Sequence, residues 1–167
     1  GLDRVRGLAE IERELAAVVT GNPAARAAAS IAVHDLASKR LGVPLYRLWG
    51  LDAAAAPATS FTIGLGSREH VRKKTAAAVD AGYPILKVKL GTDRDRELIE
   101  AVREAAPDAR VRVDANEAWT PREAVAKSEW LADRDVEFIE QPVAASDPEG
   151  LKFVYERSAL PIAVDES

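Results

Sequence analysis

Four short apolar runs in the second part of the chain end at charged residues, and these ends recur at a nearly constant interval. Lys89, Asp114, Glu140 and Asp165 are separated by 25, 26 and 25 positions. Between the runs, apolar residues recur at the three- and four-residue spacing of an amphipathic helix. Parallel strands need crossover connections of this kind, because the chain must return to the same end of the sheet. The pattern therefore predicts a parallel sheet whose strands alternate with helices.

The alternation begins at Ala58 and covers the rest of the chain. The expected strands are residues 58–63, 84–90, 110–114, 136–140 and 161–165, and the expected helices are residues 67–81, 93–105, 121–132 and 147–157. A dinucleotide-binding sheet would show a third glycine after its first strand, which "GLGSRE" lacks. One strand and one helix per interval instead favours an α/β fold made of the first five strands of a TIM-type (β/α) barrel.

The first part of the chain has a different, purely helical pattern. Two helices are expected, over residues 4–19 and 23–40. Asn22 and Pro23 are typical of a helix start, and Gly42 is typical of a helix end. The alanine-rich segment that follows leads to the first barrel strand, so we expect two parts, residues 1–50 and 58–167.

Polar residues at the strand ends predict one shared site. The carboxyl ends of parallel strands meet at one mouth of a barrel, where such folds have their chemistry. The residues expected there are Lys87, Lys89, Asp114, Asn116, Glu140, Asp165 and Glu166. Each acid or amide alone is also explained as a helix cap or an Asx turn. Three carboxylates at one place repel each other unless a cation neutralises them, and oxygen ligands without His or Cys favour Mg²⁺ over Zn²⁺.

The two lysines of "KVK" (87–89) project from the same face of one strand, because side chains alternate along a strand. A lysine acts as a base only in its neutral form, which burial and a neighbouring cation both favour. We therefore expect Lys89, nearer the strand end, to transfer a proton and Lys87 to supply the neighbouring charge. The alternative is that both lysines extend to solvent or pair with the acids without chemistry.

Charge and composition argue against several other classes of function. The net charge is −4, and acidic and basic residues are interspersed, which argues against a nucleic-acid partner or an anionic membrane surface. The chain has no cysteine, which excludes disulfides, thiol catalysis and zinc-thiolate sites. No apolar run approaches the roughly 18 residues of a membrane-spanning helix. We expect a soluble, cytoplasmic protein that acts on a small molecule.

The motifs at the strand ends also resemble a known family. "KVK", "DANEAW" (114–119), "EQP" (140–142) and "DES" (165–167) occur in the order and at the intervals of the enolase superfamily, in its muconate-lactonizing-enzyme-like branch. Longer segments such as "TSFTIGLG" (59–66) resemble dipeptide epimerases of the L-Ala-D/L-Glu type. The resemblance implies that residues 1–50 are the C-terminal helices of an α+β capping domain, and that residues 58–167 are the first five βα units of the barrel.

This resemblance implies a specific activity, an epimerase that removes the proton α to a substrate carboxylate through an enediolate intermediate. It implies Mg²⁺ as the cofactor, a dipeptide as the substrate, and a homo-oligomer as the full-length protein. Asp114, Glu140 and Asp165 would bind the metal, and Lys89 would be the acid/base with Lys87 as its electrostatic partner. Asn116 and Glu166 would support the metal ligands, and Thr62 would contact substrate.

Three alternatives stay open. A muconate-type cycloisomerase and an o-succinylbenzoate synthase or N-acylamino-acid racemase share the same metal and lysine set. Epimerisation needs a second acid/base, which the family carries as a lysine on a sixth strand, whereas these residues reach the fifth. The 167-residue chain by itself is therefore expected to be inactive. A fragment that serves only as a metal-binding or assembly module is the alternative of another class.

Overall fold

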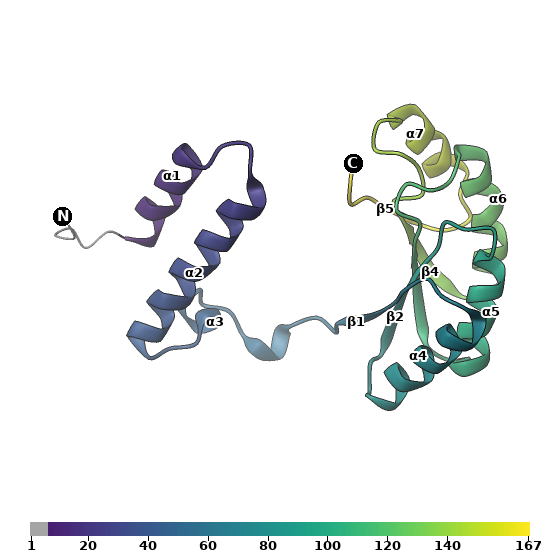
Figure 1. Ribbon diagram of the computed structural model, residues 1–167, viewed down its shortest axis with the longest axis horizontal. Helices are drawn as coiled ribbons and strands as arrows, with labels where there is room; N and C mark the ends of the chain where they lie inside the picture. The colour runs from purple at the N-terminus through teal and green to yellow at the C-terminus, as the bar shows by residue number, and fades with distance from the viewer. Residues whose placement is uncertain (1–6) are drawn as a thin grey trace. The chain divides into compact units, whose positions relative to one another are not determined.

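The computed structural model describes residues 7–167 and divides into two compact units, which meet between Pro57 and Ala58 (Figure 1). The first unit contains α1 (Leu8–Val18), α2 (Pro23–Leu41) and α3 (Leu45–Leu48), followed by a short 3₁₀ turn over Ala53–Ala55. Both predicted helices of this part are confirmed, except that residues 4–6 lie outside the described residues. That this unit belongs to a capping domain stays a prediction.

The start and end of α2 follow from the residues that flank it. The Asn22 side chain accepts a hydrogen bond from the Ala25 N–H at 3.1 Å, and Pro23 occupies the first turn, where its missing N–H costs nothing. Gly42 ends the helix with a φ of 67°, and its N–H donates to the carbonyls of Ser38 and Lys39. These are the signals that predicted the helix from the sequence.

The second unit is a five-stranded parallel sheet in the order β1-β2-β3-β4-β5. Its strands are β1 (Ser60–Ile63), β2 (Ile85–Lys89), β3 (Arg110–Asp114), β4 (Val136–Glu140) and β5 (Ile162–Ala163). The intervening helices are α4 (Arg68–Asp80), α5 (Asp95–Ala105), α6 (Pro121–Ala132) and α7 (Pro148–Arg157). The predicted βα alternation and parallel sheet are confirmed, although β5 is shorter than the expected 161–165.

The two faces of the sheet differ in chemistry. Figure 1 shows the four helices α4 to α7 on one side of the sheet. Leu86 and Val88 of β2 and Val111 and Val113 of β3 are buried in the hydrophobic core. The residues that alternate with them, including Lys87, belong to the opposite face. Burial of the apolar face stabilises the unit, and the polar face remains for the site.

An irregularity between β3 and β4 sets the alignment of the strand ends. Val111 pairs with Val136, whereas Val113 pairs with Ile139, so β4 contains one extra residue. Without this bulge, Ile139 would lie opposite Asp114; with it, Glu140 does. The 26-residue interval between Asp114 and Glu140, one longer than its neighbours, is the trace of this bulge in the sequence.

Candidate active site

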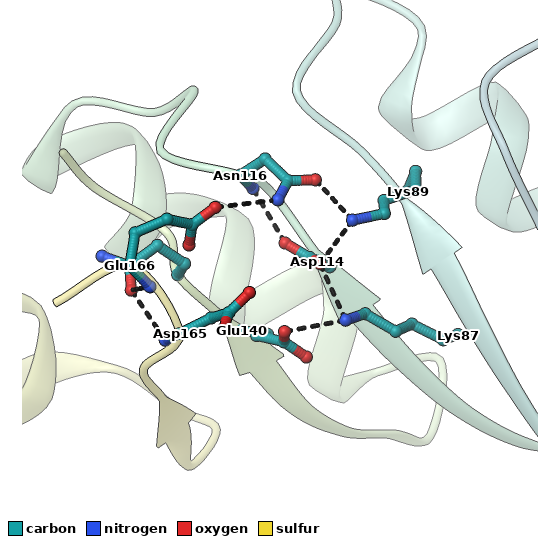
Figure 2. Close-up of polar contacts among 8 residues, drawn as sticks. Lys87, Lys89, Asp114, Asn116, Glu140, Asp165 and Glu166 are labelled. Atoms are coloured by element: carbon teal, nitrogen blue, oxygen red, sulfur yellow. Dashed lines mark hydrogen bonds and ion pairs between the residues drawn. The ribbon is translucent and has the colours of Figure 1, made fainter. Parts of the chain in front are cut away.

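Three charged residues end three neighbouring strands and lie side by side. Lys89 is the last residue of β2, Asp114 of β3 and Glu140 of β4, and the strand register aligns Lys89 with Asp114 and Asp114 with Glu140. Glu140 aligns with Ala163, the last residue of β5. Asp165 follows two residues later. Figure 2 shows these side chains together at the carboxyl end of the sheet. The predicted convergence of polar residues at the strand ends is therefore present.

Asp114 lies at the centre of the group, with a side chain only 1 % exposed. Its Oδ2 accepts a hydrogen bond from Lys89 Nζ at 2.7 Å and lies 2.9 Å from Lys87 Nζ. Its Oδ1 accepts from the backbone N–H of Asn116 at 2.9 Å. Burial raises the pKa of Asp114, but the hydrogen bonds from Lys89, Lys87 and Asn116 together outweigh it, so the pKa is lowered. Asp114 is a carboxylate at neutral pH.

Lys87 connects two of the carboxylates. Its Nζ lies 2.7 Å from Glu140 Oε1 and 2.9 Å from Asp114 Oδ2 (Figure 2). Burial lowers the pKa of Lys87, but the two carboxylates outweigh this effect, and the pKa is raised. Lys87 is consequently a fixed cation, which is the state that the predicted electrostatic role requires.

Lys89 is the more exposed of the two lysines, at 30 % against 22 % for Lys87. Its Nζ donates to Asn116 Oδ1 at 2.6 Å as well as to Asp114. Asn116 Nδ2 in turn donates to Glu166 Oε1 at 3.1 Å. These bonds fix the position of the Lys89 amine, while its side chain remains partly exposed.

The donor set suits a hard divalent cation. Asp114, Glu140 and Asp165 offer only oxygen atoms, from three consecutive strand ends. Across residues 7–167, no three acidic, His or Cys side chains are placed to share a metal ion. Asp114 and Glu140 instead form ion pairs with Lys87. The assignment of these three residues as metal ligands fits the chemistry of the donors and stays a prediction.

Comparison with known proteins decides the family. The family model described as enolase C-terminal domain-like matches residues 70–167. The chain belongs to this family. The resemblance inferred from the strand-end motifs is thereby confirmed.

Several curated relatives of this enolase-family chain are dipeptide epimerases. The chain is 42 % identical over 145 residues to the L-Ala-D/L-Glu epimerase of Bacteroides thetaiotaomicron. The matched region covers 86 % of the chain and 37 % of that protein. It is 40 % identical over 149 residues to the hydrophobic dipeptide epimerase of Enterococcus faecalis, covering 87 % and 42 %. The chain thus spans about two fifths of the length of these relatives.

Solved structures of the same superfamily share the fold. The dipeptide epimerase of Cytophaga hutchinsonii, complexed with Mg and D-Ala-L-Val, superposes with a TM-score of 0.82 at 27 % identity, over 95 % of this chain and 44 % of that one. Muconate lactonizing enzyme gives a TM-score of 0.84 at 25 % identity, over 96 % and 46 %. Both support the predicted fold class, the first part of an enolase-type barrel preceded by helices.

Thr62 lies in β1, directly opposite Lys87 in the strand register, and its side chain is exposed. It therefore shares the polar face of the sheet with the two lysines. Its contact with substrate stays a prediction, as do the supporting roles of Asn116 and Glu166.

Two buried residues of this enolase-family site were not singled out from the sequence. Asp95, at the start of α5, accepts hydrogen bonds from the backbone N–H groups of Gly91 and Thr92 at 2.9 and 2.8 Å, from Trp119 Nε1 at 3.1 Å and from Lys127 Nζ at 2.7 Å. It ties the loop after Lys89 to the loop after Asp114. Gln141 is the second, and its only signal in the sequence is its place beside Glu140 in the "EQP" motif.

Proposed function

We propose that the protein is a dipeptide epimerase that removes and returns the proton α to a substrate carboxylate. The observation that carries the proposal is the arrangement of Lys89, Asp114, Lys87 and Glu140 on adjacent strand ends. The names of the relatives, L-Ala-D/L-Glu epimerase and hydrophobic dipeptide epimerase, support the choice of substrate class.

The two lysines would have different tasks. Lys89, held by Asp114 and Asn116 at the rim, would take the α proton in its neutral form and return it in its charged form. Lys87, fixed between two carboxylates, stays charged and adds positive potential where negative charge develops. Lys89 serves one face of the substrate. Inversion also needs a second acid or base on the other face, which the family resemblance places on a sixth strand.

Asp114, Glu140 and Asp165 would hold Mg²⁺. When bound, the ion stabilises the negative charge that forms on the substrate carboxylate as the α proton leaves. Lys87, which pairs with Asp114 and Glu140, would add its own positive charge to the same stabilisation.

The test is exchange of the substrate α proton with solvent deuterium, followed by NMR, on the natural gene product with both epimers of Ala-Glu and of hydrophobic dipeptides. We expect exchange that requires Mg²⁺ and stops with a chelator. Lys89→Met should slow exchange of one of the two epimers on the order of 100- to 10,000-fold, because it removes the group that takes the proton from that face of the substrate. The matched control is Lys74→Met, which removes an exposed lysine of α4 and should leave the rate unchanged.

The same assay separates the alternatives. Cycloisomerisation of cis,cis-muconate, or racemisation of N-acylamino acids, without dipeptide exchange would replace the proposed substrate class. Exchange that survives Lys89→Met for both epimers of a dipeptide would contradict the assignment of Lys89 as the base on one face.

A further inference from the structure

Gln141 makes an unusual number of hydrogen bonds for one side chain. It is fully buried and follows Glu140 directly. Its Oε1 accepts from the backbone N–H groups of three consecutive residues, Asp165 at 2.9 Å, Glu166 at 3.0 Å and Ser167 at 3.2 Å. Its Nε2 donates to the Val143 carbonyl at 3.0 Å and to Ser167 Oγ at 2.7 Å. One amide therefore fixes the whole "DES" segment.

The backbone of Gln141 joins the same region to two other strand ends. Its N–H donates to the Ala163 carbonyl of β5 at 2.9 Å, and its carbonyl accepts from the Glu117 N–H at 2.9 Å. Gln141 thus links the ends of β3, β4 and β5. Removal of its side chain would break three part-buried hydrogen bonds from backbone N–H groups at once, which is unfavourable.

The backbone conformation around Gln141 is strained. Gln141 has a φ of 37°, and Asn116 and Glu117, on the neighbouring strand end, have φ values of 41° and 68°. Residues other than glycine rarely adopt this left-handed region, and such outliers cluster where the surrounding structure holds a functional geometry. A turn that only had to reverse the chain would be met by glycine at no such cost.

We propose that Gln141 is a positioning residue that sets the places of Asp165 and Glu166 in the site. The link to metal binding rests on the proposed function, in which Asp165 is a ligand of Mg²⁺. Glu166 extends the effect to the base, because it accepts from Asn116 Nδ2, and Asn116 Oδ1 accepts from Lys89 Nζ. The Gln141 amide is occupied by its protein partners, so it would act on the site through the residues that it holds.

The test compares Gln141→Met with Ser128→Ala in the natural gene product. Methionine keeps the length and volume of glutamine but makes none of its hydrogen bonds. Ser128 is a matched control, because it is also buried and its Oγ accepts from the Ala159 N–H, before β5 rather than after it. Amide hydrogen exchange is measured on peptides covering residues 160–167, and Mg²⁺ affinity is measured by calorimetry.

We expect Gln141→Met to speed exchange at residues 165–167 at least tenfold and to weaken Mg²⁺ binding about 10- to 100-fold, the usual effect of losing a group that orients a metal ligand. Ser128→Ala should leave both quantities within about twofold of wild type. Equal effects of the two variants on amide exchange at 165–167 and on Mg²⁺ affinity would mean that Gln141 contributes only to general stability. That result would overturn the proposal.

Amide hydrogen exchange also separates this inference from the proposed function. If the wild type binds no Mg²⁺ and exchanges no dipeptide α proton, the proposed function fails, while faster exchange at 165–167 in Gln141→Met still supports the positioning of Asp165 and Glu166. If Gln141→Met does not fold, amide hydrogen exchange of the wild type alone tests the proposal. Amides of 165–167 that exchange as fast as an unstructured peptide would show that Gln141 does not hold them.

Discussion

Asp114 pairs with both lysines, and these ion pairs make the stability of the site dependent on pH. Its pKa is lowered because the hydrogen bonds of Lys89 and Lys87 outweigh the effect of its burial. A carboxyl group with a lowered pKa stabilises the folded state above its unfolded pKa, and this contribution is lost as the pH falls through the folded pKa. The raised pKa of Lys87 matters at high pH. The stability that Lys87 contributes is lost only when the pH rises above the usual pKa of a lysine. Together the two groups favour the folded state between about pH 4 and pH 10.

We predict that Asp114→Asn lowers the free energy of unfolding by about 1.5–3 kcal/mol at pH 7, the range for hydrogen bonds to a charged group. The difference from wild type should begin to shrink below about pH 4, because the Asp114 carboxyl of the unfolded chain then takes up a proton while that of the folded protein, with its lowered pKa, does not. Urea unfolding of both proteins without Mg²⁺, at pH 7 and at pH 3.5, measures this. A difference that is the same at both values would show that the charge of Asp114 does not contribute.

At the scale of elements, two loops that carry site residues are packed against each other. Gly91 follows Lys89 by two residues and has a φ of 113°. A Cβ atom there would lie 2.6 Å from Ala118 Cβ, in the loop after Asp114, and 3.2 Å from the Ala115 carbonyl oxygen. Neither neighbour is a flexible side chain, so a substitution has to move one loop away from the other.

We predict that Gly91→Ala lowers the free energy of unfolding by about 3 kcal/mol or more, from backbone strain and overpacking together. Gly82→Ala is the matched control, because Gly82 also has a positive φ, of 82°, but has open space around it. It should cost only about 1–2 kcal/mol for the strained backbone. Equal losses in urea unfolding would mean that the contact between the loops is not tight.

The sequence predicted features that depend on local patterns, but it did not predict some contacts between residues far apart in the chain. The βα alternation, the two lysines on one face and the 26-residue interval are local patterns, and they predicted the elements and the strand-end residues. The roles of Gln141 and Asp95 depend on partners 24 to 32 positions away. Glutamine or aspartate in a loop has many local explanations, so only the folded structure shows which partners they bind.

At the scale of the whole molecule, the sheet of residues 58–167 has two outer strands, β1 and β5, each of which pairs with a neighbouring strand along one edge only. Near β5, Tyr155 and Val164 are 74 % and 54 % exposed. Unpaired strand edges with exposed apolar residues promote association between chains. The relatives are more than twice as long as the part that this chain matches, which makes the same edge a place for further barrel strands in a longer protein.

We predict that a chain limited to residues 1–167 self-associates and does not epimerise a dipeptide, even where the natural gene product is active. Association follows from the β5 edge, and Val164→Lys should reduce it, because a charge at a strand edge opposes pairing with another strand. Inactivity follows from the second acid/base that inversion requires, which the family carries on a sixth strand. Size-exclusion chromatography with light scattering measures the first property, and chiral separation of the dipeptide epimers measures the second. A monomer that epimerises dipeptides at the rate of the gene product would contradict both, and would mean that five strands with Lys89 are sufficient for the chemistry.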